Sequence, residues 1–118
     1  MPLAKKYLFV VSMDVQPDKE ALFNEVYDQE HIPHLSKVPG VISATRLKID
    51  TLRVTMAGET KTVEPEGLPR YSCILELESP DVLVSFAFAK AVDAGRWSTH
   101  VRPYTRNRHH TLHKVMGA

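Results

Sequence analysis

The 118 residues are 43% hydrophobic and 25% charged, a composition typical of one soluble globular domain with a core of limited size. A formal net charge of +1 creates no overall field that would recruit nucleic acid or an anionic membrane, and no apolar run approaches the roughly 18 residues of a membrane-spanning helix. We therefore expect a single domain over residues 1–118 without a leader peptide. Cys73 is the only cysteine, which fits a reducing, cytoplasmic location.

The first third of the chain predicts a strand, a helix and a second strand. Residues 6–15 alternate in a way that indicates a strand covered at least partly on both faces. Pro17 opens a helix whose apolar residues recur at intervals of three and four. Pro33 cannot occupy the interior of a regular helix, so we expect the regular part to end near residues 31–32, with room for one more short turn at residues 34–37. A second strand follows over residues 41–49.

A ribbon is predicted between the second and third main strands. Two Thr-rich segments, residues 52–56 and 61–64, flank a turn at residues 57–59. These segments are only weakly apolar, so we expect an extra β-ribbon over about residues 50–69 that protrudes from the domain. The third main strand covers residues 71–77.

A second helix and a long strand complete the chain. Ser79 is placed to cap this helix, Pro80 to occupy its first turn and Gly95 to end it. Residues 101–116 form a last strand that is basic and poor in apolar residues. This strand lacks the interleaved aromatic rings of a single-strand nucleic-acid binder, so we expect it to face solvent or a protein partner.

This order of elements predicts an α+β fold of the ferredoxin-like class, a β-α-β-β-α-β sandwich. Such a fold has an antiparallel sheet with two helices on one face. Apolar residues such as Phe9, Val11, Leu47 and Leu75 suggest that the second sheet face is apolar as well. An exposed apolar face favours pairing with another copy, so we expect a homodimer through the sheet face and the C-terminal strand, closing a dimeric α/β barrel.

Two short motifs resemble a known family. The Tyr-x-x-Glu-His-x-Pro order of residues 27–33 and the Pro-Gly-Val at residues 39–41 are similar to the signature of EthD-like proteins within the dimeric α/β-barrel superfamily. The residues that open and close the second helix are similar too, so the resemblance covers nearly the whole chain except residues 50–69. It implies the ferredoxin-like fold and the dimeric barrel. The superfamily includes monooxygenases, isomerases, dehydratases, decarboxylases and haem-degrading enzymes, so the fold does not settle the function.

The first of these motifs holds a candidate active site. Tyr27, Asp28 and His31 can share one side of a helix because residues three and four apart are neighbours there. His31 is the candidate general acid or base, since the ordinary histidine pKa lies near ~6.5, and Asp28 is the candidate that orients its ring. In the structural alternative, His31 only interacts with the helix C-terminus or a nearby carboxylate. The candidate substrate-binding residues are Tyr27, His34, Phe9 and Trp97.

A wider set of residues could line a cleft between the sheet and the helices or the interior of the barrel. Its apolar members are Phe9, Met13, Tyr71, Phe86 and Trp97, and its polar members are Ser12, Arg46 and Glu76. Arg46 and Glu76 can instead pair across neighbouring strands. Cys73 lies among apolar strand residues and is expected to pack rather than to react.

Metal and cofactor signals in the sequence are weak. His109 and His113 share a strand face, and a helix histidine could add a third ligand, but no spacing typical of a zinc or iron site occurs. Trp97 with His100 has a loose similarity to haem-degrading relatives, without the context of a haem ligand. We therefore expect no metal and no cofactor.

These observations lead to one main hypothesis and two alternatives. The chain is expected to form a small homodimer that binds a compact, partly apolar organic molecule. If it is an enzyme, a cofactor-free isomerisation, dehydration or decarboxylation is favoured, with His31 moving the proton. The alternatives are a non-catalytic accessory or ligand-binding protein that supports an oxygenase or a catabolic pathway, and a purely structural dimer. A solvent-exposed His31 with its ordinary pKa would favour the accessory protein.

Overall fold

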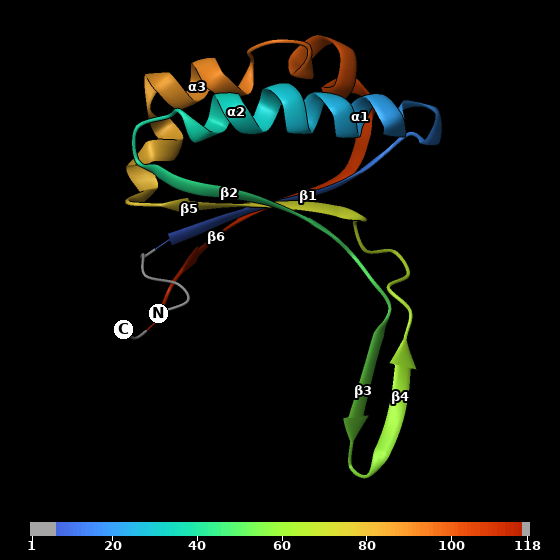
Figure 1. Ribbon diagram of the computed structural model, residues 1–118. Helices are drawn as coiled ribbons and strands as arrows, with labels where there is room; N and C mark the ends of the chain where they lie inside the picture. The colour runs from blue at the N-terminus through green and yellow to red at the C-terminus, as the bar shows by residue number, and fades with distance from the viewer. Residues whose placement is uncertain (1–6, 117–118) are drawn as a thin grey trace.

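A layer of helices covers one face of a four-stranded sheet in the computed structural model, which describes residues 7–116 (Figure 1). The strands β1 (Tyr7–Val15), β2 (Val41–Lys48), β5 (Tyr71–Leu77) and β6 (Thr105–Lys114) are antiparallel neighbours in the order β2-β5-β1-β6. This arrangement confirms the predicted α+β, ferredoxin-like class. One chain forms an open sheet, so the barrel across two copies stays a prediction. No helix in residues 7–116 is long and apolar enough to cross a membrane.

The helical layer consists of short segments. Before β2 the chain forms η1 (Pro17–Lys19), α1 (Glu20–Val26), η2 (Tyr27–His31) and α2 (Ile32–Ser36). Before β6 it forms η3 (Pro80–Val84), α3 (Phe86–Val92), η4 (Trp97–Val101) and η5 (Arg102–Tyr104). Of these, η2 and η4 are π-helical turns, in which an N–H group bonds to the carbonyl five residues earlier.

The regular α1 stops at Val26, earlier than the predicted residues 31–32, and the short turn predicted after Pro33 is present as part of α2. The Ile32 N–H donates to the Tyr27 carbonyl across the wide η2 turn, and the helix continues as α2. A proline has no N–H, and its ring clashes with the carbonyl four residues earlier in a regular α-helix. The wider turn before Pro33 relieves both problems. The other π-turn, η4, likewise ends two residues before a proline, Pro103.

The second helix is divided where the sequence predicted one continuous helix. Ser79 is the expected N-cap, and its hydroxyl accepts a hydrogen bond from the Asp81 N–H at 3.1 Å. Ser85 then interrupts the helix with extended backbone and caps α3, accepting from the Phe88 N–H at 3.1 Å. The last strand begins at Thr105 and not near residue 101, because η4 and η5 occupy the preceding residues.

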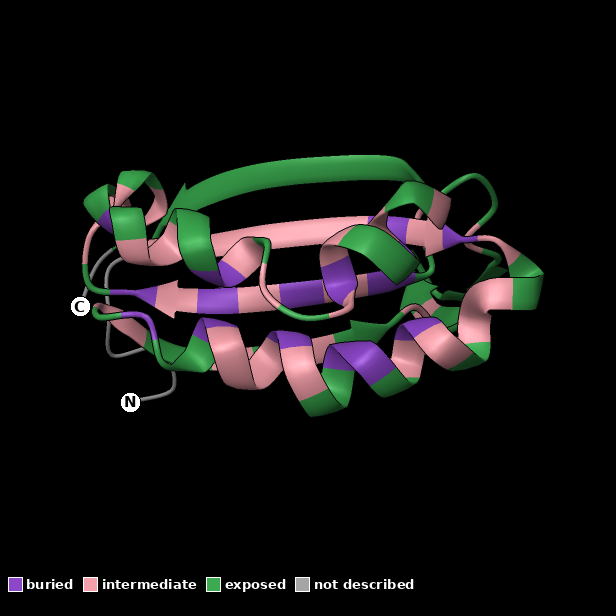
Figure 2. Cartoon of the chain, turned by 90° about the horizontal axis from the view of Figure 1, so that it is seen from above, coloured by how far each residue is buried: buried purple, intermediate pink, exposed green. Residues whose placement is uncertain are grey.

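The main core lies between the helices and the middle strands, where Figure 2 shows the buried residues concentrated. Cys73 and Leu75 of β5 are buried there, and Phe9 and Val11 of β1 pack against the same core. The prediction that Phe9, Val11 and Leu75 make the second sheet face apolar was therefore wrong, since strand residues of one parity share a face. That open face instead carries their strand neighbours Leu8, Val10 and Ile74, together with Leu47 of β2.

The ribbon of β3 (Leu52–Met56) and β4 (Glu59–Val63) extends on the side of the sheet opposite the helices (Figure 1). Its strands pair with each other and form a sheet separate from the main one. Ala57 and Gly58 have φ of +53° and +81°, as a tight two-residue hairpin turn requires. Glu59 belongs to β4, so the turn is one residue shorter than predicted.

A bulge in β6 decides which of its side chains face the helices. Ser12 pairs with His109 and Asp14 pairs with Arg106, so two residues of β6 stand opposite one residue of β1. Asn107 takes the left-handed conformation there, with φ of +52°, which Asn tolerates better than most residues. Beyond the bulge, Arg108 and His110 lie on the helix side of the sheet.

Candidate functional site

A cavity of about 380 Å³ lies between the helix side of the sheet and the helices, within the usual size range of a small-molecule site. Most of its lining is apolar or aromatic, with a few polar and charged side chains. The lining residues are Phe9, Val11, Met13, Tyr27, His31, Leu35, Leu75, Phe88, Val92, Asp93, Trp97, Arg102, Arg108 and His110.

The aromatic part of this cavity is assembled by the two π-helical turns. Tyr27 and His31 begin and end η2, and Trp97 begins η4. The His31 ring stacks on Trp97, with ring centroids 4.2 Å apart and planes 16° apart, while Tyr27 meets His31 edge-on at 5.0 Å. His31 is only 5% exposed and Trp97 only 3%. The structure therefore brings Trp97 to the pair of Tyr27 and His31 that was predicted together, and it also places Phe9 in the cavity wall.

His31 is uncharged at neutral pH. Burial, followed by the positive charges of Arg102 and other nearby groups, lowers the pKa of His31 from 6.5 to about 3. Its Nδ1 is buried and has no hydrogen-bond partner among the described residues. His31 therefore does not have the ordinary histidine pKa that was assumed for a general acid or base. A neutral imidazole still offers one donor and one acceptor nitrogen.

The expected pair between Asp28 and His31 does not form. The Asp28 carboxylate accepts a hydrogen bond from Arg46 Nη1 at 2.9 Å, and Arg46 Nη2 donates to Asn24 at 2.8 Å. The π-turn explains the difference, because it holds more residues per turn than an α-helix. Residues three apart then point away from each other, whereas Tyr27 and His31, four apart, remain in contact.

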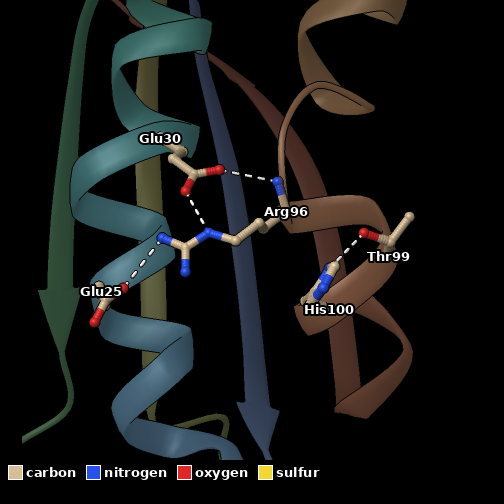
Figure 3. A network of polar contacts seen from close by, with 5 residues as sticks. All are labelled: Glu25, Glu30, Arg96, Thr99 and His100. Carbon is tan, nitrogen blue, oxygen red and sulfur yellow. Dashed lines mark hydrogen bonds and ion pairs between the residues drawn. The ribbon is translucent and has the colours of Figure 1, made fainter.

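A polar clamp joins the first helical segment to Arg96, the residue before Trp97, and Figure 3 shows its side chains Glu25, Glu30 and Arg96. Glu30 accepts hydrogen bonds from the backbone N–H of Arg96 at 2.9 Å and from its Nε at 2.5 Å. Arg96 Nη2 also contacts Glu25 at 3.1 Å. Gly95 makes room for this contact, because a Cβ there would lie 2.5 Å from Glu30 Oε1 and its φ is +65°. The sequence predicted Gly95 as a helix end and Glu30 as a possible partner of His31, and their contact with Arg96 was not predicted.

Several predicted residues lie outside this cavity. His34 belongs to a separate groove between α2 and α3, which Lys37 and Lys90 also line. Tyr71 is in the core and its hydroxyl donates to Glu20. Phe86 is 82% exposed. Met13, by contrast, lines the cavity as expected.

The predicted polar positions of the strands also serve other contacts. Ser12 and Ser72 share a hydrogen bond of 2.8 Å between β1 and β5. Glu76 accepts from Ser43 at 3.2 Å, while Arg46 bonds to α1 and η2, so the proposed Arg46–Glu76 pair does not form. The predicted residues Ser12, Arg46 and Glu76 do not line the cavity beside His31.

The remaining histidines separate across the sheet. His109 and His113 lie on its open side, whereas His110 contacts the cavity residue Phe9 at 6.0 Å between ring centroids. His100 is exposed and its Nδ1 shares a hydrogen bond with Thr99, away from the lining (Figure 3). Within residues 7–116 no group of three His, Cys, Asp or Glu side chains converges as a metal site would require.

Sequence reasoning missed Arg102, Arg108 and His110 as cavity residues. They were grouped with the basic last strand, which was expected to face solvent or a partner. The bulge at Asn107 and the turn at Pro103 direct these side chains to the cavity. Asn107 and Pro103 were the residues in the sequence that could have indicated it.

The clamp predicts that Glu30→Gln exposes Trp97, because the neutral amide holds Arg96 less strongly than the carboxylate does. Trp97 is the single tryptophan, so its fluorescence reports this site directly. We expect a red-shifted emission maximum and stronger quenching by acrylamide. Glu25→Gln, which alters only the outer arm of the clamp, should change both much less. Equal spectra for Glu30→Gln and the unaltered protein would show that the clamp does not position Trp97.

The buried His31 predicts a specific loss of stability in acid. The unfolded chain takes up a proton near pH 6.5 and the folded chain only near pH 3, so stability is lost as the pH falls through this interval. The loss amounts to about 3–5 kcal/mol of unfolding free energy, at about 1.4 kcal/mol for each unit of pKa difference. Denaturant titrations between pH 3 and 7 should show a shallower pH dependence for His31→Phe. The exposed-site control His100→Phe should keep the original slope, and identical slopes for both variants would contradict a buried neutral His31.

No protein-family model matches the chain, and no curated protein matches it in sequence. Solved structures do match. The chain is similar to the haem degrader MhuD of Mycobacterium tuberculosis, solved with two haems bound in its active site, at a TM-score of 0.62 and 12% identity over 95% of this chain and 97% of that one.

An ethyl tert-butyl ether D (EthD) family protein of Bacillus halodurans is also similar, at a TM-score of 0.59 and 13% identity over 93% of this chain and 99% of that one. Identities this low establish a shared fold and no shared activity. The chain thus has the ferredoxin-like fold of an EthD family protein, in agreement with the resemblance carried by residues 27–33 and 39–41.

Proposed function

We propose that this chain binds a compact, partly apolar organic molecule in the cavity beside the His31–Trp97 stack. The main observation in support is the neutral, buried imidazole of His31 in a largely apolar cavity of about 380 Å³. An unpartnered buried polar atom such as His31 Nδ1 is unfavourable, and such atoms in native proteins commonly mark functional sites. A ligand supplies apolar contact to the walls and a hydrogen bond to the imidazole.

One feature favours this function over a purely structural dimer. The cavity is large enough for a small organic ligand, whereas a structural domain would fill it with side chains. His31 is neither exposed nor of ordinary pKa, the two properties that would have favoured an accessory protein. A similar fold binds haem in MhuD, which supports the use of this fold for holding an organic ligand.

Haem itself fits the residues of this cavity poorly. His100, the imidazole weighed together with Trp97, is exposed and bonded to Thr99. His31 lies flat against the Trp97 ring inside the cavity, an arrangement suited to a stacked hydrogen-bonding group.

A cofactor-free acid–base reaction at His31 is the second candidate function. It would be an isomerisation, dehydration or decarboxylation in which the neutral imidazole accepts a proton from the bound molecule. A base with a pKa of about 3 accepts protons weakly at neutral pH, so this reaction needs a ligand whose negative charge raises that pKa. Without turnover, the same cavity suits an accessory protein that holds a ligand for an oxygenase or another catabolic enzyme.

Blocking the cavity should abolish ligand binding. Val92 lines the cavity, and Val92→Trp fills it with a larger ring. Val84 is 84% exposed and lies outside it, so Val84→Trp is a control with the same chemical change. In ligand-observed NMR with a panel of compact aromatic molecules, we expect the natural protein and Val84→Trp to bind the same members and Val92→Trp to bind none. Unchanged binding by a folded Val92→Trp would place the site elsewhere.

We also propose that two copies pair through the open face of the sheet. Leu8, Val10 and Ile74 form an apolar centre on this face, and Leu47 extends it with 46% exposure. The ribbon of β3 and β4 projects from the same side of the sheet, where it would flank a second copy (Figure 1). A two-fold axis lets each copy use the same patch.

A charge on the open face should separate the copies. Val10→Glu would bury a carboxylate in the proposed interface, which is strongly unfavourable. Phe86→Glu removes an exposed apolar side chain on the helix side and serves as the control. Light scattering at micromolar concentration should give twice the 13.3 kDa of one chain for the natural protein and Phe86→Glu, and 13.3 kDa for Val10→Glu. A monomeric natural protein would refute the dimer.

A further inference from the structure

We infer that the ligand carries a carboxylate, which Arg108 holds at the edge of the cavity while its apolar part lies against the aromatic wall. This inference rests on the proposed function, because it concerns the same cavity. It adds the chemical class of the ligand and assigns a binding role to Arg108.

The charges that line the cavity do not balance. Arg102 and Arg108 are cationic, and Asp93 is the one carboxylate in the lining. The pKa of His31 is about 3, and burial, followed by nearby Arg108 and His109, also lowers the pKa of His110, so both imidazoles are neutral. The cavity therefore carries an excess of one positive charge beside apolar walls, which favours an anion.

The excess charge belongs to Arg108. Arg102 donates through Nη2 to the Val92 carbonyl at 2.5 Å and to Asp93 Oδ1 at 2.8 Å, so its charge is already paired. Arg108 has no ion pair or side-chain hydrogen bond within residues 7–116. Partial burial and the neighbouring charge of Arg102 both lower the pKa of Arg108, the expected result for a guanidinium beside a like charge.

The fold directs Arg108 to the cavity through one extra residue. Without the bulge at Asn107, strand alternation would place Arg108 on the open face of the sheet. Asn107 is anchored there, because its Nδ2 donates to Asp14 at 3.1 Å and to the Gly67 carbonyl at 3.3 Å. Arg106, on the other side of the bulge, pairs with Asp14 in register and does not line the cavity.

A carboxylate matches this site better than a phosphate does. The planar guanidinium can bind both oxygens of a carboxylate, and one carboxylate neutralises the single excess charge. A phosphate monoester carries about −1.5 to −2 charges near pH 7, more than the excess in the cavity, and its larger hydration opposes the apolar walls. Phe9 and Trp97 provide surfaces for the hydrocarbon part of a compact apolar acid.

Matched pairs of ligands test this inference. Binding of phenylacetate, 2-naphthoate and their neutral amides is measured by calorimetry at low salt with the natural protein, Arg108→Gln and the control Arg106→Gln. We expect the acids to bind about tenfold or more tightly than the amides. Arg108→Gln should lower acid affinity about tenfold and leave amide affinity unchanged, a factor typical of one lost charged hydrogen bond. Arg106→Gln should change neither.

The other outcomes separate the two proposals. Amides that bind as tightly as acids, or an Arg108→Gln variant with unchanged acid affinity, would overturn the carboxylate inference while keeping the cavity as a binding site. Tighter binding of 2-naphthyl phosphate than of 2-naphthoate would overturn the choice of carboxylate. Failure of all the acids and amides to bind the natural protein would overturn the inference and the proposed function together.

Discussion

His31 and Trp97 stack where two π-helical turns meet, and the rest of the cavity depends on that contact. The turns belong to different helical segments of the one layer, so their rings touch only while these segments keep their spacing. The Glu30–Arg96 clamp supplies that constraint at the point where η4 begins. The enclosed imidazole then loses its proton, because burial removes the water that would solvate an imidazolium and the neighbouring arginines repel its charge.

A neutral imidazole beside an unpaired guanidinium determines the chemistry that this cavity can support. The guanidinium attracts an anionic group, and the imidazole adds a directed hydrogen bond without competing for that charge. An anion bound at Arg108 would also raise the pKa of His31, since an opposite charge favours the protonated ring. We propose that binding and proton transfer would be coupled at this site in that way. A ligand with a carboxylate is held first, and only then does His31 become a better base.

Local signals in the sequence predicted much of the fold. The strand over residues 71–77 and the Ser79 cap follow from alternation and from capping chemistry, which act over a few residues. Pro33 was correctly identified as incompatible with a regular helix. The effect of Pro33 on the helix was not predicted, because the helix could either end there or widen into a π-turn. Packing against the neighbouring helical segment decides which of the two occurs. The proline two residues beyond each π-turn was the available signal.

The site was harder to predict than the fold, for the same physical reason. Spacing on an ideal helix paired Asp28 with His31, but one π-turn rotates Asp28 toward Arg46. Arg108 was grouped with the basic last strand, which was expected to face solvent or a partner, and the bulge at the left-handed residue Asn107 directs it to the cavity. In both places one extra residue, in a helical turn or in a strand, changes the direction of the side chains that follow. A pattern with fixed periodicity cannot reveal such an insertion.

The protonation state of His31, measured by nitrogen-15 NMR of its imidazole, tests the account most directly. The free protein should show a neutral His31 ring from pH 5 to 8, with a midpoint near pH 3. Addition of 2-naphthoate should shift the His31 resonances and raise that midpoint. A His31 ring that titrates near pH 6.5 and does not respond to any compact acid would contradict the account.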